Sequence, residues 1–283
     1  MTDLARLEAR LSRLRELREV IRAMRGLASA RLQEARAAEP GIRRFAATVA
    51  RAFEDVAAAA DAEEIPFGRP SAAPVLLVLT AEHGFVGGFA GELARHLQEH
   101  RQPGERVAVV GQRGAARIAE QQTGILWQMP AASHTSGVVT AARGIAARLA
   151  EVSRLRLLYA EPVRGGWRPV CRTVLPPRLR SRAGRPPVAA PLSHLPPPLL
   201  AGALVPELLF AEIALALIAG FASENAARLR AMERADRNIG ERVERLRQDA
   251  NRLRQEAITT ELLDVVTGAE AVMGEERRLP QRG

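Results

Sequence analysis

Lysine is missing from this 283-residue sequence, so all 41 basic residues are arginine. Cysteine occurs once, as Cys171, which excludes an intrachain disulfide and a thiolate metal cluster. A single cysteine favours a reducing compartment. Aromatic residues make up only 4% of the chain, which favours a helix-rich protein over a β-sandwich or barrel. The arginine-only composition leaves only fork-shaped basic donors for any carboxylate or phosphate partner.

The sequence also lacks a long apolar run. Its most apolar stretch, residues 208–222, is too short to span a membrane and contains Glu212. The N-terminus is charged from Asp3 and Arg6 onward, without the apolar centre of a signal peptide. We therefore expect a soluble chain without direct membrane insertion. Its net charge of +9 fits an acidic protein surface or nucleic acid and does not choose between them.

The N-terminal residues show a heptad pattern. Apolar residues recur at spacings of three and four, which indicates a coiled-coil seam: Leu4, Leu7, Leu11, Leu14, Ile21, Met24 and Ala28. Pro40-Gly41 interrupts the pattern and predicts a kink or a restart, followed by a second helical stretch to about Ala60. We expect an N-terminal coiled-coil helix over residues 1–60.

The C-terminal part has a matching pattern. No proline occurs between Glu207 and Leu279, and apolar residues again alternate spacings of three and four, at Leu229, Met232, Ala235, Ile239, Val243, Leu246, Ala250, Leu253 and Ala257. This predicts a helix over 207–275, with a tail at 276–283. Such a helix would extend roughly 100 Å, and no small domain buries a rod of that length. We expect the N- and C-terminal helices to pair as an antiparallel coiled coil.

Residues 61–206 read as an inserted α/β domain. After a linker at 61–73, strand–turn–helix patterns follow at 74–100 and 105–122, a helix at 137–152, and two strands in "LRLLYAEPV" and "WRPVCRTVLP". Alternating strands and helices predict a Rossmann-like domain with a mainly parallel sheet. Residues 176–206 are rich in proline and basic, and they predict an irregular connection or a surface strand.

Three motifs invite chemical interpretations. "HLQEH" at 96–100 matches the pattern of inverted zinc peptidases. A match of only five residues is more often an ordinary solvent-exposed helix face than a metal site. "GFVGGFAG" and "GQRGAAR" precede helices without the Gly-x-Gly-x-x-Gly spacing, which favours tight turns over a phosphate cradle. No catalytic residue, cofactor site or metal site is expected.

Two other functional classes remain open. A nucleic-acid or scaffold adaptor would use the arginine-rich helices, but from Ser223 onward twelve arginines face twelve carboxylates. An α/β enzyme with a helical arm would carry a deep pocket at the carboxyl ends of the strands, near Gly84 to Gly88. Neither class explains the sequence patterns at both ends of the chain.

Three segments resemble the gamma-subunit family of F-type ATP synthases. They are "RLSRLRELREVIRAMRGLASARLQEA" at 10–35, "SENAARLRAMERADRN" at 223–238, and "NRLRQEAITTELLDVVTGAEAV" from residue 251. In the centre, "LTAEHGFVGGF" keeps only the glycine skeleton of the family's usual motif, while "GQRG" fits its turn. A divergent paralogue from an alternative F-type ATPase is one interpretation of these departures.

The resemblance implies a non-catalytic rotor subunit, one per complex. Its partners would be the alpha and beta subunits of the hexamer, an epsilon-type small stalk subunit and the membrane c-ring, at the cytoplasmic face of a bacterial plasma membrane. Nucleic acid would not be a partner. By position, the residues that contact beta would be Met24, Arg254, Gln255, Thr259 and Glu261. Glu224 and Arg228 would form a polar pair lower on the C-terminal helix.

Overall fold

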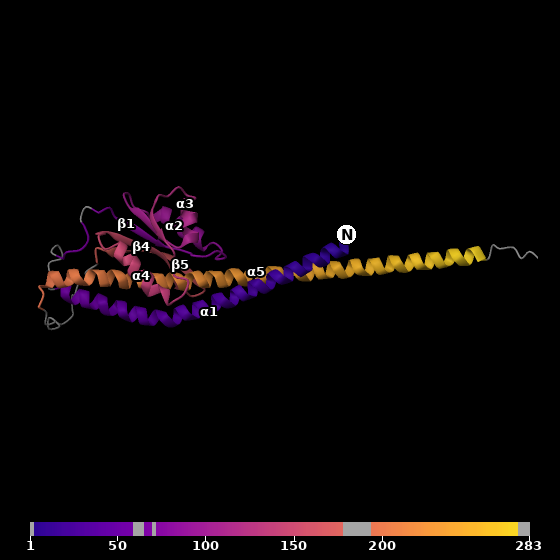
Figure 1. Cartoon of the computed structure of the whole chain (residues 1–283), viewed down its shortest axis with the longest axis horizontal. Coiled ribbons are helices and arrows are strands. Elements are labelled where there is room, and N and C mark those ends of the chain that lie inside the picture. Colours follow the sequence, from indigo (N-terminus) through magenta and orange to yellow (C-terminus); the bar gives the residue numbers. More distant parts are fainter. Residues whose placement is uncertain (1–2, 59–64, 70–71, 178–193, 277–283) are drawn as a thin grey trace, which may run out of the picture. The chain divides into compact units, whose positions relative to one another are not determined.

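The computed structural model describes residues 3–58, 65–69, 72–177 and 194–276 (Figure 1). The chain divides into two compact units. One comprises residues 1–24 with 232–283, and the other comprises residues 25–231. The helices α1 (Asp3–Ala57) and α5 (Pro197–Glu276) each contribute a segment to both units.

The larger unit is built on one five-stranded sheet with strand order β3-β2-β1-β4-β5. The strands are β1 (Val75–Leu79), β2 (Arg106–Val110), β3 (Ile125–Met129), β4 (Leu155–Val163) and β5 (Gly166–Leu175). All neighbouring pairs are parallel except β4 with β5. The predicted mainly parallel α/β domain is confirmed, with an antiparallel strand at one edge.

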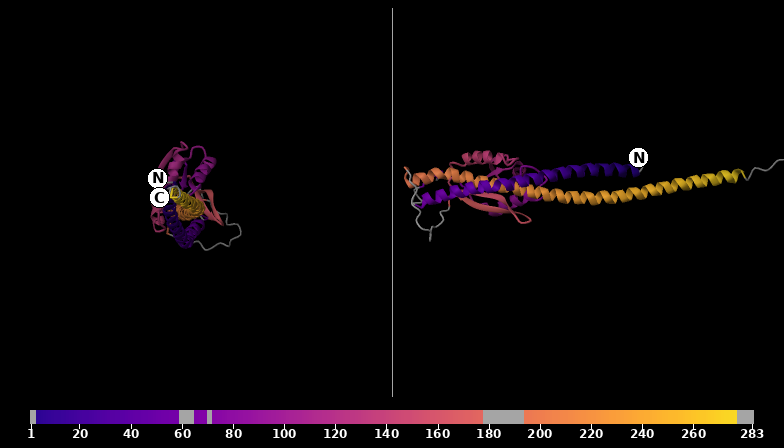
Figure 2. Two further views of the ribbon diagram at one scale, coloured as in Figure 1. Left: turned by 90° about the vertical axis from the view of Figure 1, so that its right-hand side faces the viewer. Right: turned by 90° about the horizontal axis from the view of Figure 1, so that it is seen from below.

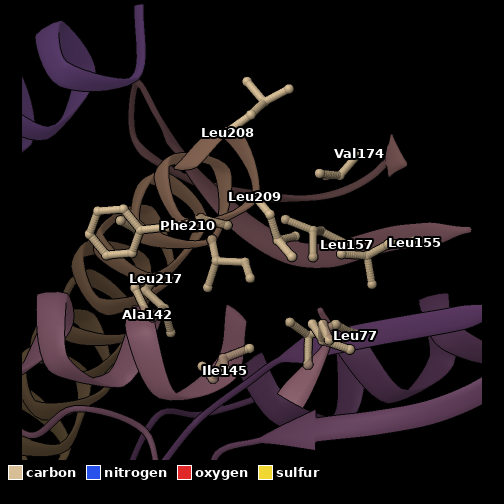
Figure 3. Close-up of a cluster of buried hydrophobic side chains, with 14 of the residues drawn as sticks. Leu77, Ala142, Ile145, Leu155, Leu157, Val174, Leu208, Leu209, Phe210 and Leu217 are labelled. Carbon is tan, nitrogen blue, oxygen red and sulfur yellow. The ribbon is translucent and has the colours of Figure 1, made fainter. Parts of the chain in front are cut away.

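Alternate residues of the strands enter two separate cores because successive side chains of a strand point to opposite faces. Leu76 and Val78 pack with α2 (Phe89–His100) and α3 (Gln112–Ala119). Leu77 and Leu157 pack on the other face with α4 (Gly137–Arg148) and segments of α1 and α5. Figure 3 shows side chains of β1, β4, α4 and α5 gathered into this second core.

The apolar stretch of α5 lies in that core. Helix α5 is long and apolar enough, in one window of mean hydropathy 2.0, to satisfy the length and composition criteria for a membrane span. Within the protein, however, 61% of that window is buried. Ile213 and Leu217 are 0% and 5% exposed and contact the sheet side of the core. Packing on the sheet therefore accounts for the hydropathy of this segment.

Three sequence-based expectations about local structure need correction. A kink or a restart was predicted at Pro40, and the restart is wrong because α1 is continuous through it. Pro40 is exposed, while Leu32, Ala35 and Val49 of the same helix pack in the core. Helix α5 begins at Pro197, so residues 197–206 are helical rather than irregular. Its first prolines occupy the first turn, where a missing N–H costs little. The edge strand β3 was not predicted at all. The rest of the proline-rich segment, 178–193, lies outside the described residues.

In the smaller unit, α1 and α5 pair antiparallel, as predicted (Figure 2). Leu11, Ile21, Met232 and Ala250 are each less than 9% exposed. The heptad position between Leu14 and Ile21 is held by Arg18, whose Nε donates to Asp236 Oδ1 at 2.7 Å. Gly240 leaves room for the Arg18 guanidinium, since a Cβ there would lie 2.9 Å from Nη2. Arg18 and Asp236 therefore form a polar layer within the described part of the coiled coil.

Two helical glycines of the α/β domain are expected to respond oppositely to alanine. A Cβ at Gly114 would lie 2.0 Å from Thr80 Cγ2, whereas a Cβ at Gly91 has no heavy atom within 4 Å. Gly114→Ala should lower the free energy of unfolding by about 1–3 kcal/mol through overpacking. Gly91→Ala should raise it by about 0.4–1 kcal/mol through reduced unfolded-state entropy. Urea unfolding of the full chain measures both, and equal effects of the two variants would contradict the packing of α3 on β1.

The polar layer of the coiled coil gives a second expectation. Asp236→Ala leaves the Arg18 guanidinium half-buried without its carboxylate and should lower the free energy of unfolding by about 1–3 kcal/mol. Glu241→Ala is the matched control, because its pair with Arg245 is exposed and worth about 0–1 kcal/mol. Thermal unfolding followed by far-UV circular dichroism compares them. Equal stability of the two variants would exclude a structural role for the layer.

Candidate functional site

A run of buried polar residues interrupts the apolar surface of α5. Ser223, Glu224, Asn225 and Arg228 are all 6% exposed or less. The Ser223 hydroxyl donates to the carbonyl of Ala160 on β4, and the Asn225 amide donates to the carbonyl of Phe221. Buried polar groups of this kind are stable only with partners. Here each side chain has at least one partner within the domain.

Arg228 and Glu224 form the centre of this polar cluster. Arg228 Nη2 donates to Glu224 Oε1 at 2.5 Å, and Nη1 donates to Asn225 Oδ1 at 3.1 Å. The same guanidinium donates to the carbonyls of Gly84 and His83, at 3.4 and 3.5 Å. Glu224 Oε2 accepts the backbone N–H of Glu82 at 3.3 Å. The pair therefore binds the backbone of the loop that follows β1.

Glu82 extends the cluster to two more elements. Its Oε2 accepts the backbone N–H of Gln112, at the start of α3, at 3.1 Å. It also accepts the N–H of Ala131, just after β3, at 2.7 Å. We name Glu82, Glu224, Asn225 and Arg228 the carboxyl-edge clamp, because they join α5 to the carboxyl ends of three strands. The sequence indicated only Glu224 and Arg228. The consecutive polar residues "SEN" within an apolar helix were the available signal for Asn225.

A cavity of about 470 Å³ lies beside the glycine-rich loop, where an α/β enzyme would have its pocket. Its lining includes Gly84, Phe85, Gly87, Arg113 and Arg117. Phe85 is 67% exposed and has a φ of 61°, so the loop presents an apolar side chain to solvent. No cysteine, serine or histidine is among the lining residues. The loop therefore provides turns and an exposed apolar surface at this edge of the sheet.

Cys171 is the one thiol of the chain, on β5. Burial raises the pKa of Cys171, although the nearby Arg156 guanidinium opposes the shift. Arg156 donates to Cys171 Sγ at 3.0 Å and forms a pair with Glu105, which is 2% exposed. A thiol with a raised pKa is a poor nucleophile. Cys171 thus belongs to a structural network.

The polar block near the end of α5 lies on an exposed helix. Arg254, Gln255, Thr259 and Glu261 are all exposed to solvent. Arg254 Nη2 donates to Glu8 Oε1 on α1 at 2.6 Å. The hydroxyls of Thr259 and Thr260 donate to carbonyls four residues earlier, those of Gln255 and Glu256, at 2.9 Å each. This bonding satisfies the hydroxyls inside the helix, which makes two adjacent threonines tolerable there.

Apolar side chains of the same segment are exposed too. Ile258, Leu262, Leu263, Val265 and Val266 are between 52% and 65% exposed. Positions 254, 258, 261 and 265 share one helical stripe, and 255, 259, 262 and 266 share the adjacent one. The predicted contact residues on α5 therefore share one continuous face with Ile258, Leu262, Val265 and Val266, whereas Leu263 lies outside both stripes. A face of this composition is typical of a binding surface.

Met24 lies on α1 in a similar setting. It is half-buried, and it shares a helical stripe with Leu17 and Val20, which are 48% and 56% exposed. The structure does not bring Met24 together with Arg254, which lies at the opposite end of the paired segment beside Glu8. The predicted residues thus form two separate surfaces on the coiled-coil unit, and the Glu224–Arg228 pair lies inside the α/β domain.

Comparison with known proteins connects these features. A family model for ATP synthase matches residues 3–272. The chain is 31% identical over 288 residues to the ATP synthase gamma chain of Frankia casuarinae, covering 93% of this chain and 95% of the relative. It is 28% identical over 298 residues to the ATP synthase gamma chain of Roseobacter denitrificans, covering 96% and 100%.

Solved structures show the same fold. A chain in the cryo-EM structure of Euglena gracilis mitochondrial ATP synthase, in the OSCP/F1/c-ring assembly and rotational state 3, aligns with a TM-score of 0.66 at 14% identity. The alignment covers 99% of this chain and 97% of that one. The match to the family model extends over the coiled coil, the clamp and the exposed end of α5. The chain belongs to the ATP synthase gamma chain family.

Proposed function

We propose that this chain is the rotating central shaft of an F-type ATP synthase. It would couple ion flow through a membrane ring to ATP synthesis or hydrolysis in an alpha–beta hexamer, one chain per complex. The chain itself would be non-catalytic. Family membership supports the assignment, and the exposed face of α5 between Arg254 and Val266 is the observation that carries it. A helix with five large apolar residues in water needs a surrounding protein.

The composition of that face suits a contact that has to be remade at each step. Exposed arginine–carboxylate pairs are worth about 0–1 kcal/mol each, so no single pair would trap the shaft. Arg254 already donates a hydrogen bond to Glu8 within the chain, and a carboxylate of a beta subunit would compete for the same guanidinium. The apolar residues that follow would turn in an apolar sleeve without forming directional bonds.

Rotation would act on the hexamer through a population shift. Each orientation of an asymmetric helix pair would favour a different conformation in each of the three beta subunits. Met24, with Leu17 and Val20, would provide a second contact on α1. Arg254, Gln255, Thr259 and Glu261 would provide the contact on α5.

The α/β domain would form the foot of the shaft. Its partners would be the c-ring and an epsilon-type small stalk subunit, and the complex would lie peripherally at the cytoplasmic face of a bacterial plasma membrane. We assign residues 61–206 to the foot together with the clamp on α5, since the clamp ties that helix to the sheet. Residues 1–60 and 207–275 would form the shaft, with 276–283 as its tail.

The contact on α5 is tested by reconstitution with alpha and beta subunits. Arg254→Ala combined with Gln255→Ala should leave one chain per hexamer while lowering coupled ATP turnover by about tenfold, equivalent to about 1.4 kcal/mol. The substitutions would remove the polar contact with a beta subunit, whereas the apolar residues of α5 would remain in place. The assay is ATP hydrolysis by the complex together with its subunit ratio.

Arg247→Ala combined with Gln248→Ala is the matched control, because both side chains are exposed one turn or more earlier on the same helix. It should retain wild-type turnover. If the chain never joins the hexamer, the rotor assignment fails. If both double variants lose turnover equally, the contact is not specific to Arg254 and Gln255.

The clamp would help to transmit torque from α5 to the α/β domain. Arg228→Met removes the cation and leaves the Glu224 carboxylate buried, which should lower the free energy of unfolding by about 3–5 kcal/mol. Arg230→Met is the control two residues along, where the arginine is only partly buried and bonds a loop carbonyl at Gly165. Fluorescence of Trp127 and Trp167, both in the α/β domain, reports unfolding in urea. An equal loss of stability in both variants would contradict a specific role of the Glu224–Arg228 pair in stabilising the domain.

A further inference from the structure

The last turns of α2 bring two imidazoles and a carboxylate together. The rings of His96 and His100 stack with centroids 3.8 Å apart, and Glu99 Oε2 lies 3.6 Å from His96 Nδ1. One ligand atom from each of the three residues lies within 4.8 Å of the other two. The sequence pattern alone favoured a solvated helix face. The spatial convergence of the three groups is the new observation.

Hydrogen bonds orient two of these groups. His100 Nδ1 lies 3.1 Å from the carbonyl of His96, and a proton on Nδ1 would leave Nε2 free to bind a metal ion. Glu99 uses its two oxygens differently. Oε1 accepts from Arg95 Nη1 at 2.7 Å, whereas Oε2 faces His96. Arg95 also lies 3.3 Å from Glu92, so its charge is shared between two carboxylates.

The end of α2 is fixed to the sheet. Arg156 Nη1, on β4, donates to the carbonyl of His100 at 3.0 Å and to both Glu105 oxygens at 3.0 and 3.1 Å. On the neighbouring turn, Gln98 Nε2 donates to Thr123 Oγ1 at 2.7 Å. The backbone that carries His96, Glu99 and His100 is thus anchored from two sides. A site built on a rigid element loses little entropy when a ligand binds.

We propose that His96, Glu99 and His100 bind a divalent transition-metal ion with zinc-like preferences. Two imidazoles and a carboxylate are ligands that zinc accepts, and tetrahedral zinc with bonds of about 2.1 Å separates its ligand atoms by about 3.5 Å. Rotation of the exposed Glu99 and His100 side chains closes the remaining distance. The fourth position would take water or a side chain of a neighbouring subunit. This site does not depend on the proposed rotor function.

Zinc binding to the full-length chain, freed of any affinity tag, tests the proposal. Competition with a chromogenic chelator should give one zinc ion per chain. His96→Ala and His100→Ala should each weaken binding by about tenfold or more, and Glu99→Gln should also weaken it. Cobalt(II) should give visible ligand-field absorption with the wild type that the double variant His96→Ala, His100→Ala loses.

His134→Ala is the control, because His134 is an exposed histidine of the same domain. Far-UV circular dichroism should show that all variants fold alike, since Glu99, His100 and His134 are exposed and His96 is only partly buried. Unchanged zinc affinity in the double variant overturns the proposal. So does an equal loss in His134→Ala, which would mean adventitious binding by surface histidines. The exposed Glu99→Gln substitution keeps the test valid if either alanine variant is poorly folded.

Discussion

Burial of the first part of α5 against one face of the sheet is the interaction on which the rest of the structure depends. Ile213 and Leu217 pack with Leu77 and Leu157, so the helix is fixed before it leaves the domain. Its later segments then change character with their surroundings. The polar clamp follows the apolar core, the heptad seam follows the clamp, and a face of exposed polar and apolar residues follows Leu253. One continuous helix thus contributes to the core, the clamp, the coiled coil and an exposed face.

The clamp explains how a charged pair is stable inside the domain. Arg228 and Glu224 neutralise one another, and backbone groups of the loop after β1 satisfy their remaining hydrogen-bonding capacity. Replacement by apolar residues would fill the same space without binding that loop. The polar pair therefore fixes which strand edge the helix faces, in addition to any contribution to stability. In the proposed rotor, that relation would set the orientation of the shaft on its foot.

The sequence predicted those features whose signals are local. Leucine spacing indicated the coiled coil, and the fully apolar runs at 75–79 and 107–110 indicated central strands. It missed β3, because Ile125–Met129 is a half-buried edge strand that includes the exposed Gln128. The predicted start of α5 was wrong, because prolines generally disfavour a helix. Pro197 is tolerated since it lies in the first turn. Of the clamp, only Glu224 and Arg228 were predicted, because the hydrogen bond between Glu82 and Glu224 joins residues far apart in the chain.

The Arg18–Asp236 layer has a mechanical consequence. Smooth apolar seams allow two helices to slide along one another, because every heptad offers a similar set of contacts. Here the guanidinium lies over Gly240, where a larger residue would collide with it. A slip of one heptad would move the Arg18 guanidinium away from both Gly240 and Asp236. The layer therefore specifies the register of the helix pair and opposes axial sliding. It leaves the outer faces of both helices accessible to other proteins.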